Sequence, residues 1–148
     1  MNRFRTGYDS GMSSSGMALA EPAVDGPQPA SLVASFRDAT CLPALRRWLR
    51  EHLAEDSDAR CDAELVCTEL VTNAVEHAHG PRSVRITMLD PLRLRIEVDD
   101  GEPGARPTLG RSRFGSVRGR GLMLVDTVSR WGVRRRRTGK TVWATLGT

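Results

Sequence analysis

Two neighbouring segments near the middle of the chain alternate apolar and polar residues on either side of an Asp-Pro pair. Residues 83–89 (SVRITML) and 92–98 (LRLRIEV) are typical of the two strands of a β-hairpin, because every second side chain lies on the same face. The apolar face of such a hairpin has to be covered by another layer of secondary structure. The pattern therefore predicts a sheet that is covered by helices on one side.

Two helical segments precede this hairpin and can supply the second layer. Residues 42–54 (LPALRRWLREHLA) have the spacing of an amphipathic helix. A second helix is predicted to begin at Ser57 or Asp58, either of which can act as its N-cap, and to run to about His79, because a Gly-Pro pair follows. Its apolar residues form one arc that must face the sheet, namely Ala63, Val66, Cys67, Leu70, Val71, Ala74 and Ala78.

The remaining segments complete an α+β pattern. Residues 31–37 predict a first strand, residues 122–130 a short helix, and residues 131–137 and 141–146 a second hairpin. Residues 99–119 are rich in Gly, Pro and Arg and predict a long loop, which in a compact domain is usually functional or mobile. The expected fold is a two-layer α/β sandwich, with helices on one face of a mixed, largely antiparallel sheet.

The length and composition fit one globular domain. The chain has 148 residues, of which 39% are hydrophobic and 27% charged. Residues 1–30 are rich in Gly, Ser, Pro and Met and are expected to form a disordered tail, so the domain should span residues 31–148. That tail contains no apolar run long enough for a signal-peptide core or a membrane span. The expected location is the cytoplasm, where Cys41, Cys61 and Cys67 would be free thiols.

The net charge of +4 is unevenly distributed along the chain. Residues 1–103 carry 11 Lys and Arg against 17 Asp and Glu, whereas residues 104–148 carry 11 against 1. The basic C-terminal third is compatible with a solvated surface, with a site for a polyphosphate or an acidic partner, or with nucleic-acid binding. No recognition motif and no interleaved aromatic residues support nucleic-acid binding.

Glu69 and Asn73 lie one turn apart at the edge of the apolar arc of the second helix. The simplest interpretation is a polar pair that faces solvent. The alternative is that both side chains reach into a cavity between helix and sheet, where a carboxylate is costly unless something polar occupies the space.

Three further stretches favour the second interpretation. They are Asp99-Asp100-Gly101-Glu102-Pro103, Gly119-Arg120-Gly121-Leu122 and Gly139-Lys140-Thr141. In their order after the E-x-x-x-N-A stretch of the second helix, they resemble the GHKL superfamily of histidine-kinase-like ATPases, which have the Bergerat fold. The resemblance is greatest to the branch of small anti-sigma factors that are serine protein kinases, and it covers residues 31–148.

The resemblance implies a site for ATP and Mg²⁺. Glu69 would be the catalytic residue that polarises a nucleophile, and the side-chain oxygen of Asn73 would bind the metal. Asp99 would accept a hydrogen bond from the adenine amino group, Gly101 would let the base lie against the backbone, and Thr141 would help to fix the adenine. His77, one turn after Asn73, is expected to line the pocket.

The second glycine stretch is expected to bind the phosphates. Backbone N–H groups at a helix N-terminus attract phosphate because they are unpaired and lie at the positive end of the helix dipole. The residues expected to contribute there are Arg118, Gly119, Arg120, Gly121 and Leu122. Pro103 stands where the wider superfamily often has another glycine, so details of loop closure do not carry over from the resemblance. The loop over residues 104–118 is expected to be mobile without nucleotide and to close when ATP binds.

Two functional classes remain open at this point. The first is a Mg²⁺-ATP-dependent serine/threonine protein kinase that phosphorylates an antagonist protein in a partner-switching system and also acts as an anti-sigma factor. The second is a nucleotide-dependent module that sequesters a regulator without efficient transfer. The expected partners are therefore a sigma factor and its antagonist, and the resemblance also suggests a homodimer. No membrane partner is expected, and a nucleic-acid binder is the third and weakest alternative.

Overall fold

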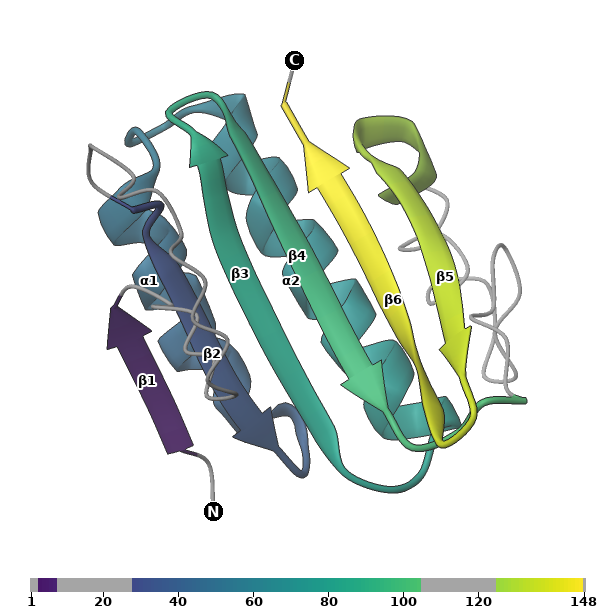
Figure 1. Cartoon of the computed structure of the whole chain (residues 1–148). Helices are drawn as coiled ribbons and strands as arrows, with labels where there is room; N and C mark the ends of the chain where they lie inside the picture. Colours follow the sequence, from purple (N-terminus) through teal and green to yellow (C-terminus); the bar gives the residue numbers. More distant parts are fainter. Residues whose placement is uncertain (1–2, 8–27, 105–124, 148) are drawn as a thin grey trace, which may run out of the picture.

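The computed structural model describes residues 3–7, 28–104 and 125–147. Its sheet has six strands in the order β1-β2-β3-β4-β6-β5 (Figure 1). The strands are β1 (Arg3–Gly7), β2 (Ser31–Phe36), β3 (Arg82–Asp90), β4 (Arg93–Asp100), β5 (Arg130–Arg136) and β6 (Gly139–Leu146). Every pair of neighbouring strands is antiparallel, which agrees with the largely antiparallel sheet that the sequence predicted.

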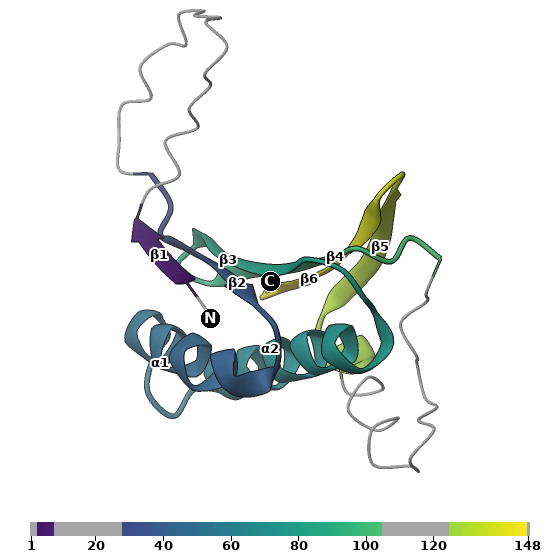
Figure 2. The same ribbon diagram turned by 90° about the horizontal axis from the view of Figure 1, so that it is seen from below.

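The described helices lie on one face of this sheet (Figure 2). A short 3-10 turn, η1 (Ala39–Cys41), leads into α1 (Leu42–His52), and α2 (Asp58–His77) follows after a polar break. Ser57 is the N-cap of α2, because its hydroxyl accepts a hydrogen bond from the backbone N–H of Arg60 at 3.1 Å. The expected α+β sandwich with one helical layer is confirmed.

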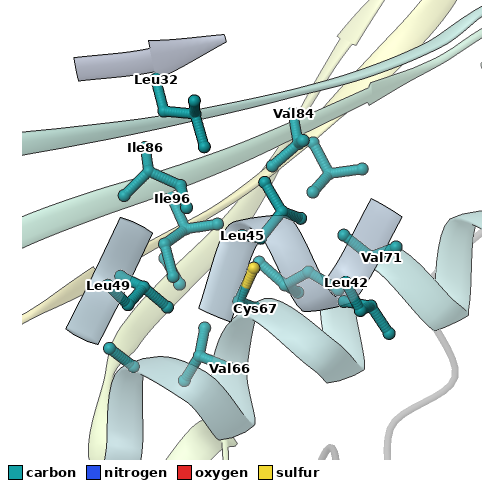
Figure 3. Packing of buried hydrophobic residues seen from close by; sticks show 14 of the residues in the cluster. Leu32, Leu42, Leu45, Leu49, Val66, Cys67, Val71, Val84, Ile86 and Ile96 are labelled. Carbon is teal, nitrogen blue, oxygen red and sulfur yellow. The ribbon is translucent and has the colours of Figure 1, made fainter. Parts of the chain in front are cut away.

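The core lies between α1, α2 and the inner face of the sheet. Figure 3 shows side chains of both helices packed against those of β2, β3 and β4. The central side chains of this core are almost fully buried. They are Leu45 and Leu49 of α1, Val66 and Leu70 of α2, and Ile86, Ile96 and Val98 of the sheet. Burial of such side chains contributes about 1.5–3 kcal/mol each, so this layer holds α2 firmly against the sheet.

The structure differs from the expected disordered tail at the N-terminus of the chain. Arg3–Gly7 form strand β1, which pairs with β2 in antiparallel register. The physical reason is that an edge strand presents unpaired backbone groups, and another segment can satisfy them whatever its composition. Residues 8–27 of the expected tail lie outside the described residues.

The other elements lie close to their predicted positions. The first hairpin is longer than expected, because β3 begins at Arg82 and β4 continues to Asp100. Helix α2 ends at His77, two residues before the expected end. Of the predicted short helix, the described residues 125–128 are helical, and most of the predicted mobile loop, from residue 105 on, lies outside the described residues.

Candidate functional site

Strand β4 alternates between the two faces of the sheet, and this alternation decides which of its side chains meet the helices. Leu94, Ile96 and Val98 are buried in the core, so the next residue on the same face is Asp100, which is 3% exposed. Asp99 lies between them in sequence and therefore on the outer face, where about half of its side chain is exposed. The carboxylate that faces the helical layer is thus that of Asp100.

Glu69 and Asn73 lie on the inner side of the sheet. Both side chains are buried on α2, with 8% and 5% of their surface exposed, beside the apolar arc that packs against β4 and β6. A pair exposed to solvent, the simplest interpretation of the sequence, is therefore wrong. The Glu69 carboxylate and the Asn73 amide, one turn apart, form a buried polar pair in an otherwise apolar layer.

Asp100 is held by Lys140 in a buried ion pair. The Lys140 ammonium lies 2.9 Å from Oδ2 and 3.1 Å from Oδ1 of Asp100, and its third donor reaches the carbonyl oxygen of Glu102 at 3.1 Å. Lys140 is only 2% exposed. Oδ1 of Asp100 also accepts the backbone N–H of Glu102 at 2.8 Å. Because all three ammonium donors have acceptors, the cost of burying this charge is offset.

The end of α2 and the end of β4 meet at a close contact between glycines. A Cβ on Gly101 would lie 2.9 Å from the Cα of Gly80, and one on Gly139 would lie 2.0 Å from the carbonyl oxygen of Asp100. The N–H of Gly101 donates to the carbonyl of His79 at 2.8 Å. Only glycine allows backbones to approach so closely. These contacts bring the last turns of α2, which carry Asn73, to the end of β4, which carries Asp100.

Arg82 ties the C-terminus of α2 to the sheet. Its guanidinium donates to the carbonyl oxygens of Ala74 at 3.1 Å and Ala78 at 2.5 Å, and also to that of Arg37 at 3.2 Å. Ala74 and Ala78 lie at the C-terminal end of α2, where the helix dipole favours a cation. These hydrogen bonds fix the C-terminal end of α2, the helix that carries Glu69 and Asn73.

A second polar cluster lies on the outer face of the sheet. Thr141 donates a short hydrogen bond to Oδ1 of Asp99, Ser83 lies 3.4 Å from Oδ2, and Arg136 lies 3.5 Å from Oδ1 and also contacts Thr141. The cross-strand register pairs Asp99 with both Ser83 and Thr141. A shallow pocket of about 350 Å³ opens beside this cluster. It is also lined by Ser35, Pro81, Arg82, Asp100, Gly101 and Thr138.

The structure therefore groups the predicted site residues into two sets. Glu69 and Asn73 are buried on the inner side, and Asp99 and Thr141 come together on the outer side, whereas the sequence predicted one shared pocket. The physical reason is the pleat of β4 and β6, which sends successive side chains to opposite faces.

The remaining predicted residues have different positions. His77 ends α2, is partly buried, and has its Nε2 3.6 Å from a carboxylate oxygen of Glu76. Gly101 lies at the end of β4 in the glycine contact described above. The predicted phosphate-binding stretch lies outside the described residues, namely Arg118, Gly119, Arg120, Gly121 and Leu122.

Asp100 and Lys140 were not among the residues predicted for the site. A signal for both was present in the sequence, because Asp100 continues the alternation of Leu94, Ile96 and Val98, and Lys140 continues that of Val142 and Ala144. The Asp-x-Gly spacing favoured Asp99 over Asp100. Lys140 was not predicted because a lysine side chain is rarely buried so fully.

Residues 37–146 match the histidine kinase-like ATPase domain family. The match covers most of the chain, and the chain therefore belongs to this family of ATPase domains. The superfamily expected from the sequence is confirmed, and ATP is the ligand that the family assigns to the domain. No helix in the described ranges is long and apolar enough to cross a lipid bilayer.

Two individual proteins are similar to this chain. An uncharacterised protein of Streptomyces coelicolor is 38% identical over 73 residues, which cover 47% of this chain and 70% of that protein. The histidine kinase domain of a blue-light activated histidine kinase from Erythrobacter litoralis shares 20% identity with a TM-score of 0.45. That likeness covers 72% of this chain but only 58% of the other, so the chain spans little more than half of that solved structure.

Proposed function

We propose that the protein is a Mg²⁺-ATP-dependent serine/threonine protein kinase that regulates a partner protein. The observation that carries the proposal is the burial of Glu69 and Asn73 on the sheet side of α2, in a chain that belongs to an ATPase domain family. Burying a carboxylate beside an amide costs stability, and a bound polar ligand would offset this cost.

The base of the nucleotide is proposed to meet Asp100 rather than Asp99. Asp100 lies on the same side of the sheet as Glu69 and Asn73, and its buried carboxylate can accept a hydrogen bond from an exocyclic amino group. Asp99 lies on the outer face, where it already accepts a hydrogen bond from Thr141. Asp100 therefore takes over the role that the family resemblance suggested for Asp99.

The residues present also fit a magnesium ion held partly by the nucleotide. Among the described residues no cluster of three His, Cys, Asp or Glu side chains could hold a metal alone. Mg²⁺ in phosphoryl-transfer sites is typically bound by one or two protein oxygens together with phosphates and water, and the Asn73 side-chain oxygen can supply one such ligand. When bound, the ion would neutralise charge on the phosphates.

Glu69 is proposed to act on the acceptor. Its carboxylate can take the proton of a serine or threonine hydroxyl as the oxygen attacks the γ-phosphate, so that the phosphoryl group passes from ATP to the hydroxyl and ADP leaves. Glu69 lies among buried apolar residues of α2, and a site from which water is excluded would favour transfer to a protein hydroxyl over hydrolysis.

The protein substrate is proposed to be an antagonist in a partner-switching system, with a sigma factor as the second partner. This part of the proposal rests on the resemblance to anti-sigma kinases. It is supported by β5, an edge strand on which Arg134, Arg135 and Arg136 are exposed, since such a strand suits an acidic protein surface. A sigma factor acts in the cytoplasm, so the proposal also places the protein there.

A transfer assay tests this function. The full chain is incubated with Mg²⁺ and γ-labelled ATP together with candidate antagonists, and phosphoserine and phosphothreonine are identified by mass spectrometry. Glu69→Gln should bind ATP normally but lose about 10²-fold or more in transfer rate. Glu76→Gln, an exposed change on the same helix, should have no effect. Tight ATP binding without transfer to any candidate would favour the alternative, a nucleotide-dependent module that sequesters a regulator.

A further inference from the structure

We infer that Lys140 reads the nucleobase together with Asp100, by donating a hydrogen bond to the ring nitrogen next to the amino group of adenine. This inference rests on the proposed function of the inner face as an ATP site. It assigns a specificity-determining role to a residue for which neither the family match nor the sequence motifs predicted one.

The first step is the placement of the ammonium. Lys140 and Asp100 are directly opposite each other in the register of β4 and β6, and both are nine-tenths or more buried on the helix-covered face. The ammonium is anchored by the Glu102 carbonyl as well as by Asp100. It is therefore a fixed donor beside a fixed acceptor, in the layer that also contains Glu69 and Asn73.

The second step is a count of hydrogen-bonding capacity. Oδ1 of Asp100 accepts from both Lys140 and the N–H of Glu102, whereas the only described donor to Oδ2 is Lys140. A carboxylate oxygen has two lone pairs, so Oδ2 retains one acceptor position within the described part of the chain. An amino group of a base can use that position without breaking the ion pair.

The third step concerns the ammonium itself. All three of its donors are engaged, two of them by the same carboxylate. If the bond to Oδ1 is released, Oδ1 keeps the Glu102 N–H, and the ammonium keeps Oδ2 and the Glu102 carbonyl. The freed donor then lies beside the acceptor that receives the amino group.

An acceptor and a donor side by side match one edge of adenine. Its amino group donates, and the adjacent ring nitrogen N1 accepts. Asp100 alone would recognise only the amino group. With Lys140 both positions are recognised, and a base that lacks the ring acceptor leaves a buried donor without a partner, which is costly.

Nucleotide analogues test this inference by calorimetry on the full chain. ATP is compared with 1-deaza-ATP, in which N1 is replaced by C–H, and with purine riboside triphosphate, which lacks the amino group. The wild-type protein should bind 1-deaza-ATP at least about tenfold more weakly than ATP. In Lys140→Met that penalty should disappear, because no donor addresses N1. Arg134→Met, which removes an exposed cation on the outer face of the neighbouring strand, should keep the full penalty.

Each outcome separates this inference from the proposed function. Equal affinity of the wild-type protein for ATP and 1-deaza-ATP would overturn the role of Lys140, even if purine riboside triphosphate bound weakly and so supported Asp100. An absence of ATP binding would overturn the proposed function itself. Lys140→Met leaves Asp100 without its cation and could unfold the protein. The double variant Asp100→Asn with Lys140→Met has no such charge and is compared with Asp100→Asn alone. The 1-deaza penalty should remain in Asp100→Asn and disappear in the double variant, and its persistence in the double variant would overturn the role of Lys140.

Discussion

Asp99 and Asp100 are adjacent in β4, yet their carboxylates lie on opposite faces of the sheet. Asp99 accepts a hydrogen bond from Thr141 on the outer face, whereas Asp100 lies 2.9 Å from the Lys140 ammonium on the helix-covered face. Successive side chains of a strand point to opposite faces of the sheet, and this alternation separates the two carboxylates. The same one-residue step separates Thr141 from Lys140 in β6, so each face has its own polar set.

The glycine contact between α2 and β4 predicts a large effect of one methyl group. Gly101→Ala should lower the free energy of unfolding by about 1–3 kcal/mol, because its Cβ would lie 2.9 Å from both the Cα of Gly80 and the carbonyl oxygen of His79. Urea unfolding measures the change. Gly104→Ala is the matched control, since a Cβ there has no heavy atom within 4 Å. Equal stability of the two variants would contradict the proposed packing.

The fold could be predicted from local patterns because the patterns agree with one another. The alternation of residues 83–89 and 92–98 fixes which side of the first hairpin is buried, and Ser57 has the N-cap role expected for the start of α2. Strand β1 could not be predicted, because its pairing with β2 depends on an available sheet edge and not on the apolar content of Arg3–Gly7.

The candidate site could be predicted only in part. Periodicity placed Glu69 and Asn73 at the edge of the buried arc of α2, where the structure has them. The Asp-x-Gly motif indicated Asp99. The alternation of buried residues along β4, from Leu94 through Ile96 and Val98, instead places Asp100 on the buried face. The closeness of Gly101 to Gly80 depends on a contact between distant segments, and no local pattern predicts such a contact.

The three thiols should react at very different rates with alkylating reagents. Cys61 is exposed, whereas Cys41 and Cys67 are buried. Burial raises the pKa of Cys41 to about 11 and that of Cys67 to about 12, so neither forms the reactive thiolate near neutral pH. Brief treatment of the folded protein should therefore label Cys61 alone, as peptide mass spectrometry can show. Labelling of Cys67 at a comparable rate would contradict its burial.

The same thiols predict a loss of stability at alkaline pH. The folded-state pKa of Cys67 lies above the ordinary value of 9.0, so its contribution is fully present below 9.0 and is lost as the pH rises toward about 12. Urea unfolding should show lower stability at about pH 10 than at about pH 8. The decline should be smaller in Cys67→Ala, and an identical decline in both proteins would exclude Cys67 as its source.

Asn73→Ala should remove the magnesium-dependent part of ATP affinity. Its side-chain oxygen is the proposed protein ligand for the ion, and the affinity measured with excess chelator should change little. Calorimetry with Mg²⁺ and with EDTA gives both values. Thr72→Ala, a neighbouring and partly buried change on α2, serves as the control. If Asn73→Ala kept the full difference between the two conditions, Asn73 would not be the ligand.

The central claim is that the nucleotide base binds on the helix-covered face, at Asp100. The most direct test is calorimetric titration of Mg²⁺-ATP into wild type, Asp100→Asn and Asp99→Asn, with thermal unfolding to show that each variant is folded. Asp100→Asn should weaken binding by about 1.5–3 kcal/mol, because the amino group loses a charged acceptor, and Asp99→Asn should bind as wild type does. Full affinity of Asp100→Asn, together with weakened binding by Asp99→Asn, would place the base on the other face and contradict the account.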